Sequence, residues 1–263
     1  MSIITLTTDF GIKDGNVGAM KGVIWNIAPQ AQIADLSHLI TPQNIPEAAL
    51  IVARAAPYFP ADTIHVAVVD PGVGTQRRPI AARLGNQFVV GPDNGVFTML
   101  LENTEKNSQP VQWVHLDQHQ FWLENISNVF HGRDIFAPVA GHLASGIPLE
   151  KLGSPISDPV RLNFNQPMRT VYGWRGEIIH IDHFGNIHTN IRTEHLQDAK
   201  VATIRVCGVN IQGMVRTFGE RSSGELIGLF GSNGNLIVSV VNGNAARRLN
   251  ARLEDRVEIF LEG

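Results

Sequence analysis

Two carboxylates of the N-terminal half stand directly after predicted strands, where an open α/β sheet binds its ligands. Asp9 follows an apolar strand that we predict over 3–7, and Asp70 follows a buried strand predicted over 63–69. A loop carboxylate such as Asp9 is suited to accept hydrogen bonds from two hydroxyl groups, as ribose-binding acids do. The same residue type is typical of an N-cap or an Asx turn, so position alone leaves both interpretations open.

The loop that begins at Asp70 brings a carboxylate near two guanidiniums. Pro71 and two glycines shape the turn, and Arg77 and Arg78 close the segment. An Asp near an Arg is held ionised and oriented, which serves either a structural salt bridge or a pair that polarises water. The loop has neither the Gly-Lys-Ser/Thr ending of a P-loop nor the Gly-x-Gly-x-x-Gly pattern of a dinucleotide site.

His131 stands at the start of a helix predicted over 132–146. Histidine is the side chain most easily poised for proton transfer near neutral pH, but a single histidine is more often a surface or hydrogen-bonded residue than a catalyst. The other histidines form no His-Glu-x-x-His helix or compact ligand set, even where two are close, as His115 and His119 are. We therefore predict no metal site.

Three turns of the C-terminal part gather polar and small residues. They are Asp182–Asn186, Phe230–Gly234 and Asn242–Ala246. Together they offer a carboxylate, an aromatic face, amide groups and exposed backbone, which recognition of a zwitterionic, base-containing small molecule requires. Each turn taken singly is explained as well by ordinary hairpin chemistry.

Strands and helices alternate through the first part of the chain, which predicts an α/β domain with a largely parallel sheet covered on both faces. A proline-rich stretch over 147–170 is typical of a connection between domains. Beyond it, short strands joined by Gly/Asn turns predict a smaller all-β barrel or sandwich, with one short helix in the NAARRL segment. We assign 1–160 to the N-terminal α/β domain and 161–263 to the C-terminal β-barrel domain. Further helices are predicted over 17–28, 45–59 and 95–102, and further strands over 31–35, 79–84, 87–90 and 111–116.

Composition excludes several classes of protein. The chain has 263 residues, of which 43% are apolar and 17% charged, as in a folded globular protein. A net charge of −3 with no basic block argues against nucleic-acid binding. The single cysteine, Cys207, suits a reducing compartment, and no signal peptide or membrane span is visible. We expect a soluble cytoplasmic protein that does not bind membranes.

The set of motifs resembles that of the S-adenosyl-L-methionine (SAM) hydrolases that form adenosine, also called SAM hydroxide adenosyltransferases, which are related to fluorinase and chlorinase. Each motif alone is weak, but six in this order cover essentially the whole chain. They are TTDFG at 7–11, VDPGVG at 69–74, GPDNG at 91–95, FHGRD at 130–134, DHFGN at 182–186 and NGNAA at 242–246.

The resemblance implies a homotrimer in which SAM binds between the N-terminal domain of one subunit and the C-terminal domain of its neighbour. It also implies that Asp70, Arg77 and His131 together activate a water molecule. The substrate contacts that it implies are Asp9 to the ribose with Asn16 as a nearby polar contact, Asp182 to the methionine amino group, Phe184 and Asn186 on the adenine side, Ser232 to the methionine carboxylate, and the backbone of Ala245 to adenine. Halogenases carry an arginine after that serine, whereas this chain carries Asn233.

The activity implied by the resemblance is attack of water or hydroxide on C5′ of SAM, which releases adenosine and L-methionine without a metal or cofactor. The leaving group is a neutral thioether, so activation of the nucleophile limits the rate, because water is a very weak acid. Whether Asp70 or His131 takes its proton stays open. A SAM-dependent 5′-halogenase is one alternative, but Asp70 puts a carboxylate where halogenases carry a tyrosine. A non-catalytic SAM- or nucleoside-binding protein is the other, and it would not need Asp70, Arg77 and His131 together.

Overall fold

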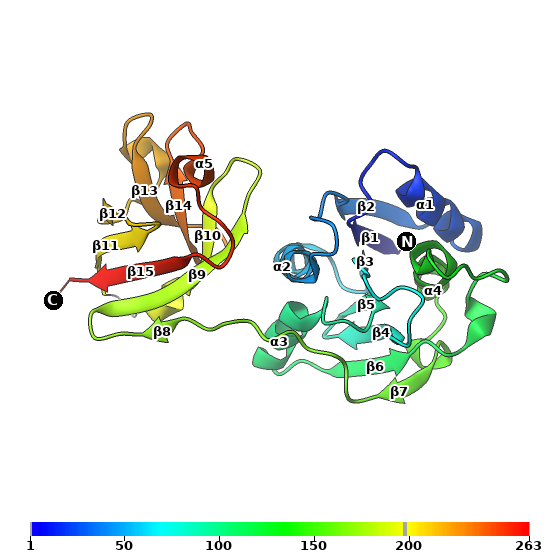
Figure 1. Cartoon of the computed structure of the whole chain (residues 1–263). Helices are drawn as coiled ribbons and strands as arrows, with labels where there is room; N and C mark the ends of the chain where they lie inside the picture. Colours follow the sequence, from blue (N-terminus) through cyan, green and yellow to red (C-terminus); the bar gives the residue numbers. More distant parts are fainter. Residues whose placement is uncertain (1, 197–198, 263) are drawn as a thin grey trace. The chain divides into compact units, whose positions relative to one another are not determined.

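The computed structural model describes residues 2–196 and 199–262. The chain divides into two compact units, of which the first ends at Leu162 and the second begins at Asn163 (Figure 1). We call them the N-terminal unit and the C-terminal unit and describe each by itself. Among the described helices, none has both the length and the apolar character that crossing a membrane requires.

The N-terminal unit contains a seven-stranded sheet. In chain order its strands are Ile3–Thr8 (β1), Gln32–Ser37 (β2), Ile64–Val68 (β3), Pro79–Leu84 (β4), Gln87–Pro92 (β5), Val111–His115 (β6) and Ser154–Ile156 (β7). Their order across the sheet is β2-β1-β3-β5-β4-β6-β7. The β1–β2, β1–β3 and β3–β5 pairs are parallel, whereas β4–β5, β4–β6 and β6–β7 are antiparallel. The sheet is therefore mixed, and the largely parallel sheet that we expected describes only one half of it.

The antiparallel half begins where β4 turns into β5, because only Gly85 and Asn86 separate these strands. A two-residue connection joins two strands as an antiparallel hairpin, since a parallel pair needs a crossover of a dozen or more residues. Gly85 has a φ of +62°, and a Cβ there would lie 2.6 Å from the Gln109 side chain. The predicted strands 79–84 and 87–90 already carried this signal in their spacing.

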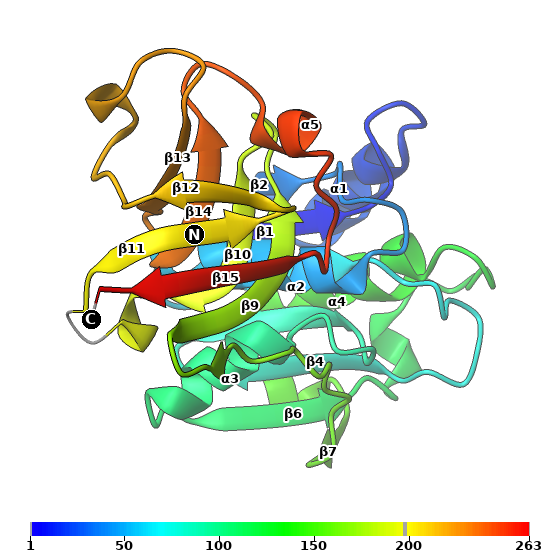
Figure 2. The ribbon, with the colours of Figure 1, turned by 60° about the vertical axis from the view of Figure 1, so that its left-hand side comes forward.

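Helices cover both faces of this sheet (Figures 1 and 2). Successive residues of β3 point into different cores: Val66 packs in the same cluster as Met20, and Ala67 in the same cluster as Val52. This period of two is that of a strand buried on both faces. The first cluster is covered by Asn16–Ile27 (α1) and Ala137–Ala144 (α4), and the second by Ile45–Ala55 (α2) and Thr98–Lys106 (α3).

Two predicted helices are shorter than expected because proline interrupts them. The helix predicted over 45–59 is α2 followed by a 3₁₀ turn at Ala56–Tyr58 (η1), which contains Pro57. The helix predicted over 132–146 starts as a π-helical turn, Gly132–Phe136 (η3), and becomes α-helical where Pro138 occupies the first turn of α4. Proline is tolerated in a first turn, since its missing N–H has no partner there. Single π turns are rare and frequent at functional sites, and this one follows His131 directly. The remaining short turns of this unit are His119–Phe121 (η2) and Leu149–Lys151 (η4).

The C-terminal unit is one antiparallel sheet that curls into a barrel-like form. Its strands are Met168–Arg169 (β8), Gly173–Ile181 (β9), Ile187–Arg192 (β10), Val201–Val206 (β11), Val209–Gln212 (β12), Leu226–Phe230 (β13), Asn235–Val240 (β14) and Arg256–Leu261 (β15). The order is β12-β11-β15-β9-β10-β14-β13, with β8 beside β9. The two end strands approach each other, since the Val215 N–H just after β12 donates to the Gly228 carbonyl of β13 at 2.9 Å. The helix predicted in NAARRL is confirmed as Ala245–Leu249 (α5), and Thr193–His195 (η5) and Phe218–Glu220 (η6) are short 3₁₀ turns.

The first half of the proline-rich stretch is bound to the N-terminal unit. The buried carboxylate of Asp93 pairs with Arg78 and accepts the Val160 N–H at 2.7 Å, while Arg78 also holds Asp158 at 2.9 Å. The Leu162 N–H then donates to the Thr98 hydroxyl at 2.9 Å. These contacts explain why the compact N-terminal unit extends to Leu162.

Candidate active site

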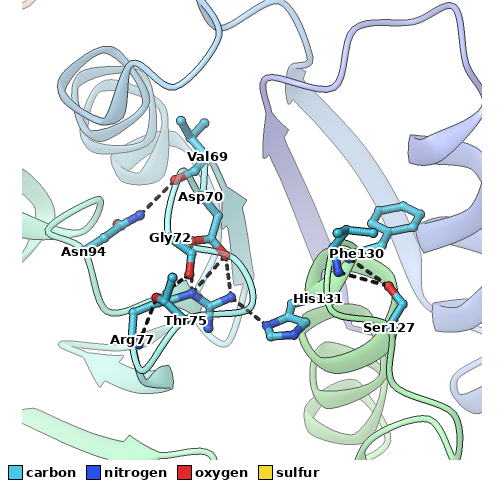
Figure 3. A network of polar contacts seen from close by, with 10 residues as sticks. Val69, Asp70, Gly72, Thr75, Arg77, Asn94, Ser127, Phe130 and His131 are labelled. Carbon is cyan, nitrogen blue, oxygen red and sulfur yellow. Dashed lines mark hydrogen bonds and ion pairs between the residues drawn. The ribbon is translucent and has the colours of Figure 1, made fainter.

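The Asp70 carboxylate and the Arg77 guanidinium form a close ion pair in the loop after β3 (Figure 3). Arg77 Nε lies 3.0 Å from Asp70 Oδ1 and 2.9 Å from Oδ2, and Arg77 Nη2 also donates to Oδ2. Both side chains are nearly buried, with 5% of Asp70 and 10% of Arg77 exposed. The guanidinium lies 5.2 Å from the centre of the Phe136 ring, which shields one face from water. The neighbouring Arg78 is turned away to Asp93, so the two guanidiniums of the sequence motif serve different carboxylates.

His131 completes a network of three side chains from the other side of Arg77 (Figure 3). Arg77 Nη2 lies 2.9 Å from His131 Nδ1. A guanidinium only donates, so Nδ1 is the acceptor and the neutral ring carries its proton on Nε2. Burial and then the charge of Arg77 lower the pKa of His131 below its ordinary value of 6.5, against the opposing effect of Asp70 and Asp134. His131 is therefore a neutral imidazole at pH 7 that presents an N–H donor.

A segment before His131 supports this network. The fully buried Asp134 accepts the Ser127 N–H at 2.8 Å and pairs with Arg133 at 2.6 Å. Burial alone raises the pKa of Asp134, but the Arg133 guanidinium and the Ser127 N–H lower it below its usual range. One residue further, the Asn128 carbonyl lies against Gly74 of the Asp70 loop. Asp134 thus holds the segment on which the Asp70 loop rests.

We expect Gly74→Ala to destabilise the N-terminal unit by more than the cost of its backbone angle. Gly74 has a φ of +76°, which costs an L residue about 1–2 kcal/mol. The new Cβ would also lie 2.4 Å from the Asn128 carbonyl oxygen, so the two loops must separate. Urea unfolding followed by tryptophan fluorescence measures the loss. The matched control is Gly146→Ala, where φ is +89° and no atom lies within 4 Å of the added Cβ. Equal losses in the two variants would contradict a tight contact at Gly74.

Asp9 lies in the loop after β1, beside the segment that carries His131. The Phe10 ring would be 3.2 Å from a Cβ on Gly132 and packs edge-on against Phe130, with ring centres 5.6 Å apart. One Asp9 oxygen accepts the Gln43 backbone N–H at 2.8 Å. Asn16, the first residue of α1, is exposed. The loop of Asp9 and the network of Asp70, Arg77 and His131 therefore form one region of the N-terminal unit.

Two functional groups of this region were missed from the sequence. Asp134 belongs to the FHGRD motif, so its position in the motif was the available signal. The Gln43 N–H is a backbone group held at a φ of 66°, and no side-chain pattern indicates such a donor.

In the C-terminal unit, Asp182 organises the turn between β9 and β10. Its Oδ1 accepts the N–H groups of Phe184 and Asn186 at 2.9 and 2.8 Å, and its Oδ2 accepts the Asn186 side-chain amide at 2.8 Å. The same Oδ2 lies 3.3 Å from His188 Nε2. Burial raises the pKa of Asp182, but these hydrogen bonds, led by that of the Asn186 side chain, lower it below its usual range. Phe184 is left 72% exposed at the tip.

This turn packs on the start of α5. Gly185 has a φ of +83°, and a Cβ there would lie 2.1 Å from the Asn244 side chain. The Gly185 carbonyl accepts the Ala246 N–H at 3.0 Å, next to the buried Ala245. The structure thus brings together Asp182, Phe184, Asn186 and Ala245, which come from two motifs far apart in the sequence.

Ser232 and Asn233 lie at the other end of this sheet, in the turn between β13 and β14. In the β10–β14 ladder, Ile187 next to the Asp182 turn is opposite Val238, whereas Arg192 is opposite Asn235 next to Ser232. The register of this ladder shifts between His188 and Arg192, so the two turns adjoin the same pair of strands at different positions. The expected contacts of Asp182 and Ser232 with one methionine stay predictions.

Within the described ranges, no three His, Cys, Asp or Glu side chains come close enough together to hold a metal ion. His119 instead stacks on Trp122, with ring centres 4.2 Å apart, and His188 contacts Asp182.

Nearly the whole chain matches two family models and several known proteins. A family model described as the SAM hydroxide adenosyltransferase N-terminal domain matches residues 4–153, and one described as the C-terminal domain of the same family matches residues 176–258. The chain is 38% identical over 260 residues to the (R)-S-adenosyl-L-methionine hydrolase of Salinispora tropica, covering 97% of each protein. A crystal structure of an uncharacterised conserved protein from Thermotoga maritima matches with a TM-score of 0.89 at 34% identity, covering 99% of this chain and 100% of that one.

A fluorinase from Actinopolyspora mzabensis is a more distant relative. It is 28% identical over 226 residues, which cover 76% of this chain and 74% of that protein. The identity and the coverage are both lower than for the hydrolase from Salinispora.

Proposed function

The chain belongs to the SAM hydroxide adenosyltransferase family, and from that premise we propose that it hydrolyses SAM to adenosine and L-methionine. Water or hydroxide attacks C5′, the C5′–sulfur bond breaks, and the electron pair leaves with sulfur as the neutral thioether of methionine. One proton of the water must be removed, and no proton has to be supplied to the leaving group. The observation that carries this proposal is the network of Asp70, Arg77 and His131.

The roles of the three side chains follow from their hydrogen bonds. Arg77 takes the lone pair of His131 Nδ1, so the neutral ring has a proton on Nε2 and donates it to the oxygen of the water. Asp70 is then the acceptor for the water proton, because among the described residues Oδ1 accepts one hydrogen bond, from Arg77 Nε, and a carboxylate oxygen accepts two. Arg77 orients both partners, and its positive charge stabilises developing hydroxide.

The proposed substrate contacts divide between the two units. Asp9, with Asn16 nearby, binds the ribose hydroxyls on the N-terminal unit. Asp182 binds the methionine amino group, and Phe184, Asn186 and the Ala245 backbone bind adenine. Asp182 already has four polar contacts, so the ammonium replaces the longest of them, the 3.3 Å contact to His188. Ser232, with Asn233 beside it, binds the methionine carboxylate.

The pKa of His131 sets the acid limit of the reaction. Since burial and Arg77 lower that pKa below 6.5, His131 stays neutral and active as the pH falls through 6.5. Below the lowered pKa, a proton on Nδ1 faces the Arg77 guanidinium and breaks the contact, so kcat/KM declines. The contribution of His131 to the folding stability depends on pH in the same direction as kcat/KM. This contribution is fully present above the pKa of histidine in the unfolded chain and is lost as the pH falls through the lowered pKa. A kcat/KM profile from pH 4.5 to 8 should show an acid limb below 6.5, and His131→Gln should lack it. A wild-type limb above 6.5 would contradict this assignment.

The test of the function uses SAM in ¹⁸O-labelled water with a chelator present. We expect equal amounts of adenosine and methionine, with the label in the 5′ oxygen of adenosine because attack is at C5′. Tight binding of SAM without adenosine would favour a binding protein. Adding chloride or fluoride and finding 5′-halo-5′-deoxyadenosine as the main product would favour a halogenase. A carboxylate near the nucleophile repels a halide by about 4 kcal/mol at 4 Å in an effective dielectric of 20, which is why we prefer water.

We also propose the assembly and setting that the family resemblance implies. The protein is a homotrimer of an α/β domain, residues 1–160, and a β-barrel domain, residues 161–263, with SAM held between subunits. It uses no cofactor, since SAM is the substrate, and works in the cytoplasm. Mixed trimers test the shared site: Asp70→Asn and Asp182→Asn subunits, each inactive alone, should recover activity when co-expressed. No recovery would place the whole site within one chain.

A further inference from the structure

A buried histidine behind the proposed ribose site ties two loops together. The loops are Asp9–Gly11, directly after Thr8 at the end of β1, and His38–Gln43, after β2, and both follow the carboxyl ends of adjacent parallel strands. His38 Nδ1 lies 2.9 Å from the Thr8 hydroxyl, and the His38 carbonyl accepts the Gly11 N–H at 2.8 Å. Asp9, the proposed ribose ligand, lies between these two contacts. From this placement we infer that His38 is a positioning residue that holds Asp9 in the geometry that binds the ribose.

The second loop also contacts Asp9 directly. The Gln43 N–H donates to Asp9 Oδ2 at 2.8 Å, and Gln43 has a φ of 66°. A non-glycine residue in that region costs about 1–3 kcal/mol and persists only where its surroundings hold it. His38, 7% exposed, and Ile40, 2% exposed, bury the start of this loop. His38 therefore supports the donor that orients one Asp9 oxygen as well as the backbone on either side of Asp9.

Thr8 connects the His38 ring to the backbone of the Asp9 loop. Its hydroxyl accepts the Phe10 N–H at 3.2 Å while contacting His38. Thr8 is fully buried, so it cannot act on a substrate itself. Phe10 packs against Gly132 next to His131, so a shift of the Asp9 loop would also displace the segment that carries His131.

The other nitrogen of the His38 ring lies beside an ion pair. His38 Nε2 is 3.0 Å from Asp35 Oδ1, and Asp35 pairs with Lys21 at 2.7 Å. A register shift in the β1–β2 ladder makes this possible: Leu6 is opposite Asp35, but Thr7 is opposite Ser37. Such bulges re-aim side chains beside functional sites. Here the extra residue brings His38 to the level of Thr8.

The same unit offers a matched control deeper in the sheet. His65 of β3 is fully buried and its Nδ1 lies 2.8 Å from the Thr5 hydroxyl of β1. This second histidine–threonine pair lies within the parallel strands, away from the Asp9 loop. A histidine that serves only the fold should behave like His65.

The experiment measures ligand discrimination. Calorimetry gives the Kd of adenosine and of 2′,3′-dideoxyadenosine for the wild type, His38→Leu and His65→Leu, and thermal unfolding gives their stability. We expect the wild type to prefer adenosine, His38→Leu to weaken adenosine about tenfold with little effect on the dideoxy compound, and His65→Leu to keep the preference at reduced stability. His38→Asn, which keeps a polar atom near the Nδ1 position, should recover part of the preference, and it replaces His38→Leu if that variant does not fold.

The proposal is overturned if His38→Leu keeps the wild-type preference, if His65→Leu loses it equally, or if the wild type shows none. It rests on the proposed function only in taking Asp9 as the ribose ligand. The experiment measures binding of a nucleoside, so its outcome is independent of the hydrolysis assay. A protein that binds adenosine with the expected preference but makes none from SAM would contradict the hydrolase proposal and still support the role of His38.

Discussion

In the Asp70→Asn variant we expect kcat for SAM hydrolysis to fall about 10³-fold, while the Kd for SAM changes only a few-fold. A positioned general base contributes about 10²–10⁴-fold, and the amide that replaces the carboxylate cannot take a proton from water. Asn still offers one oxygen to Arg77, so the loop keeps part of its hydrogen bonding. The ground-state complex is affected little, since none of the proposed substrate contacts involves Asp70. Single-turnover formation of adenosine and calorimetric binding of SAM measure the two effects separately.

Asp158→Asn is the matched control for that variant. Asp158 pairs with Arg78, the neighbour of Arg77, but is 76% exposed and lies at the edge of the N-terminal unit. Its removal should leave kcat within about twofold, because an exposed ion pair contributes little. If Asp70→Asn lost SAM affinity as much as turnover, Asp70 would be a binding residue and the proton would have to leave by another route.

How far the sequence predicted the fold depended on whether the information was local. Helix α1 was predicted within one residue at each end, because its apolar spacing stops before Pro29. The short helix α5 was also predicted, and its Asn244 cap accepts the Arg247 N–H as such caps do. The antiparallel half of the first sheet was missed, although two residues between β4 and β5 allow only a hairpin.

The candidate site shows the same division. In the proposed water-activating network Asp70 and Arg77 share one loop, whereas His131 comes 54 residues after Arg77, and only the family resemblance joined it to them before the structure did. The turn that carries Ser232 also matched a motif, but its position beside the start of β14 and opposite Arg192 follows from the strand register, which the sequence does not show. The Gln43 donor and the role of His38 depend on a bulge and a backbone angle, and neither of these features leaves a pattern in side-chain type.

Arg77→Met should destabilise the N-terminal unit by about 3–5 kcal/mol and abolish hydrolysis. Asp70 is only 5% exposed, and the two nitrogens of Arg77 supply its three hydrogen bonds. Removing one partner of a buried ion pair leaves an uncompensated charge, which accounts for that cost. Met keeps much of the side-chain volume, so a cavity contributes little. Urea unfolding followed by fluorescence reports mainly this unit, because Trp25, Trp113 and Trp122 lie in it and only Trp174 lies in the other.

The double variant Asp70→Asn/Arg77→Met separates lost charge pairing from lost packing. If the cost of Arg77→Met is the unpaired carboxylate, then neutralising Asp70 in the same chain should restore most of the stability, although the double variant stays inactive. If instead the methionine simply packs badly against Phe136, the second substitution will restore nothing. Recovery of stability without activity would show that the pair stabilises the fold through mutual neutralisation, whereas catalysis needs the base and the guanidinium themselves. This outcome is expected when the same buried contact both holds a loop and polarises a nucleophile.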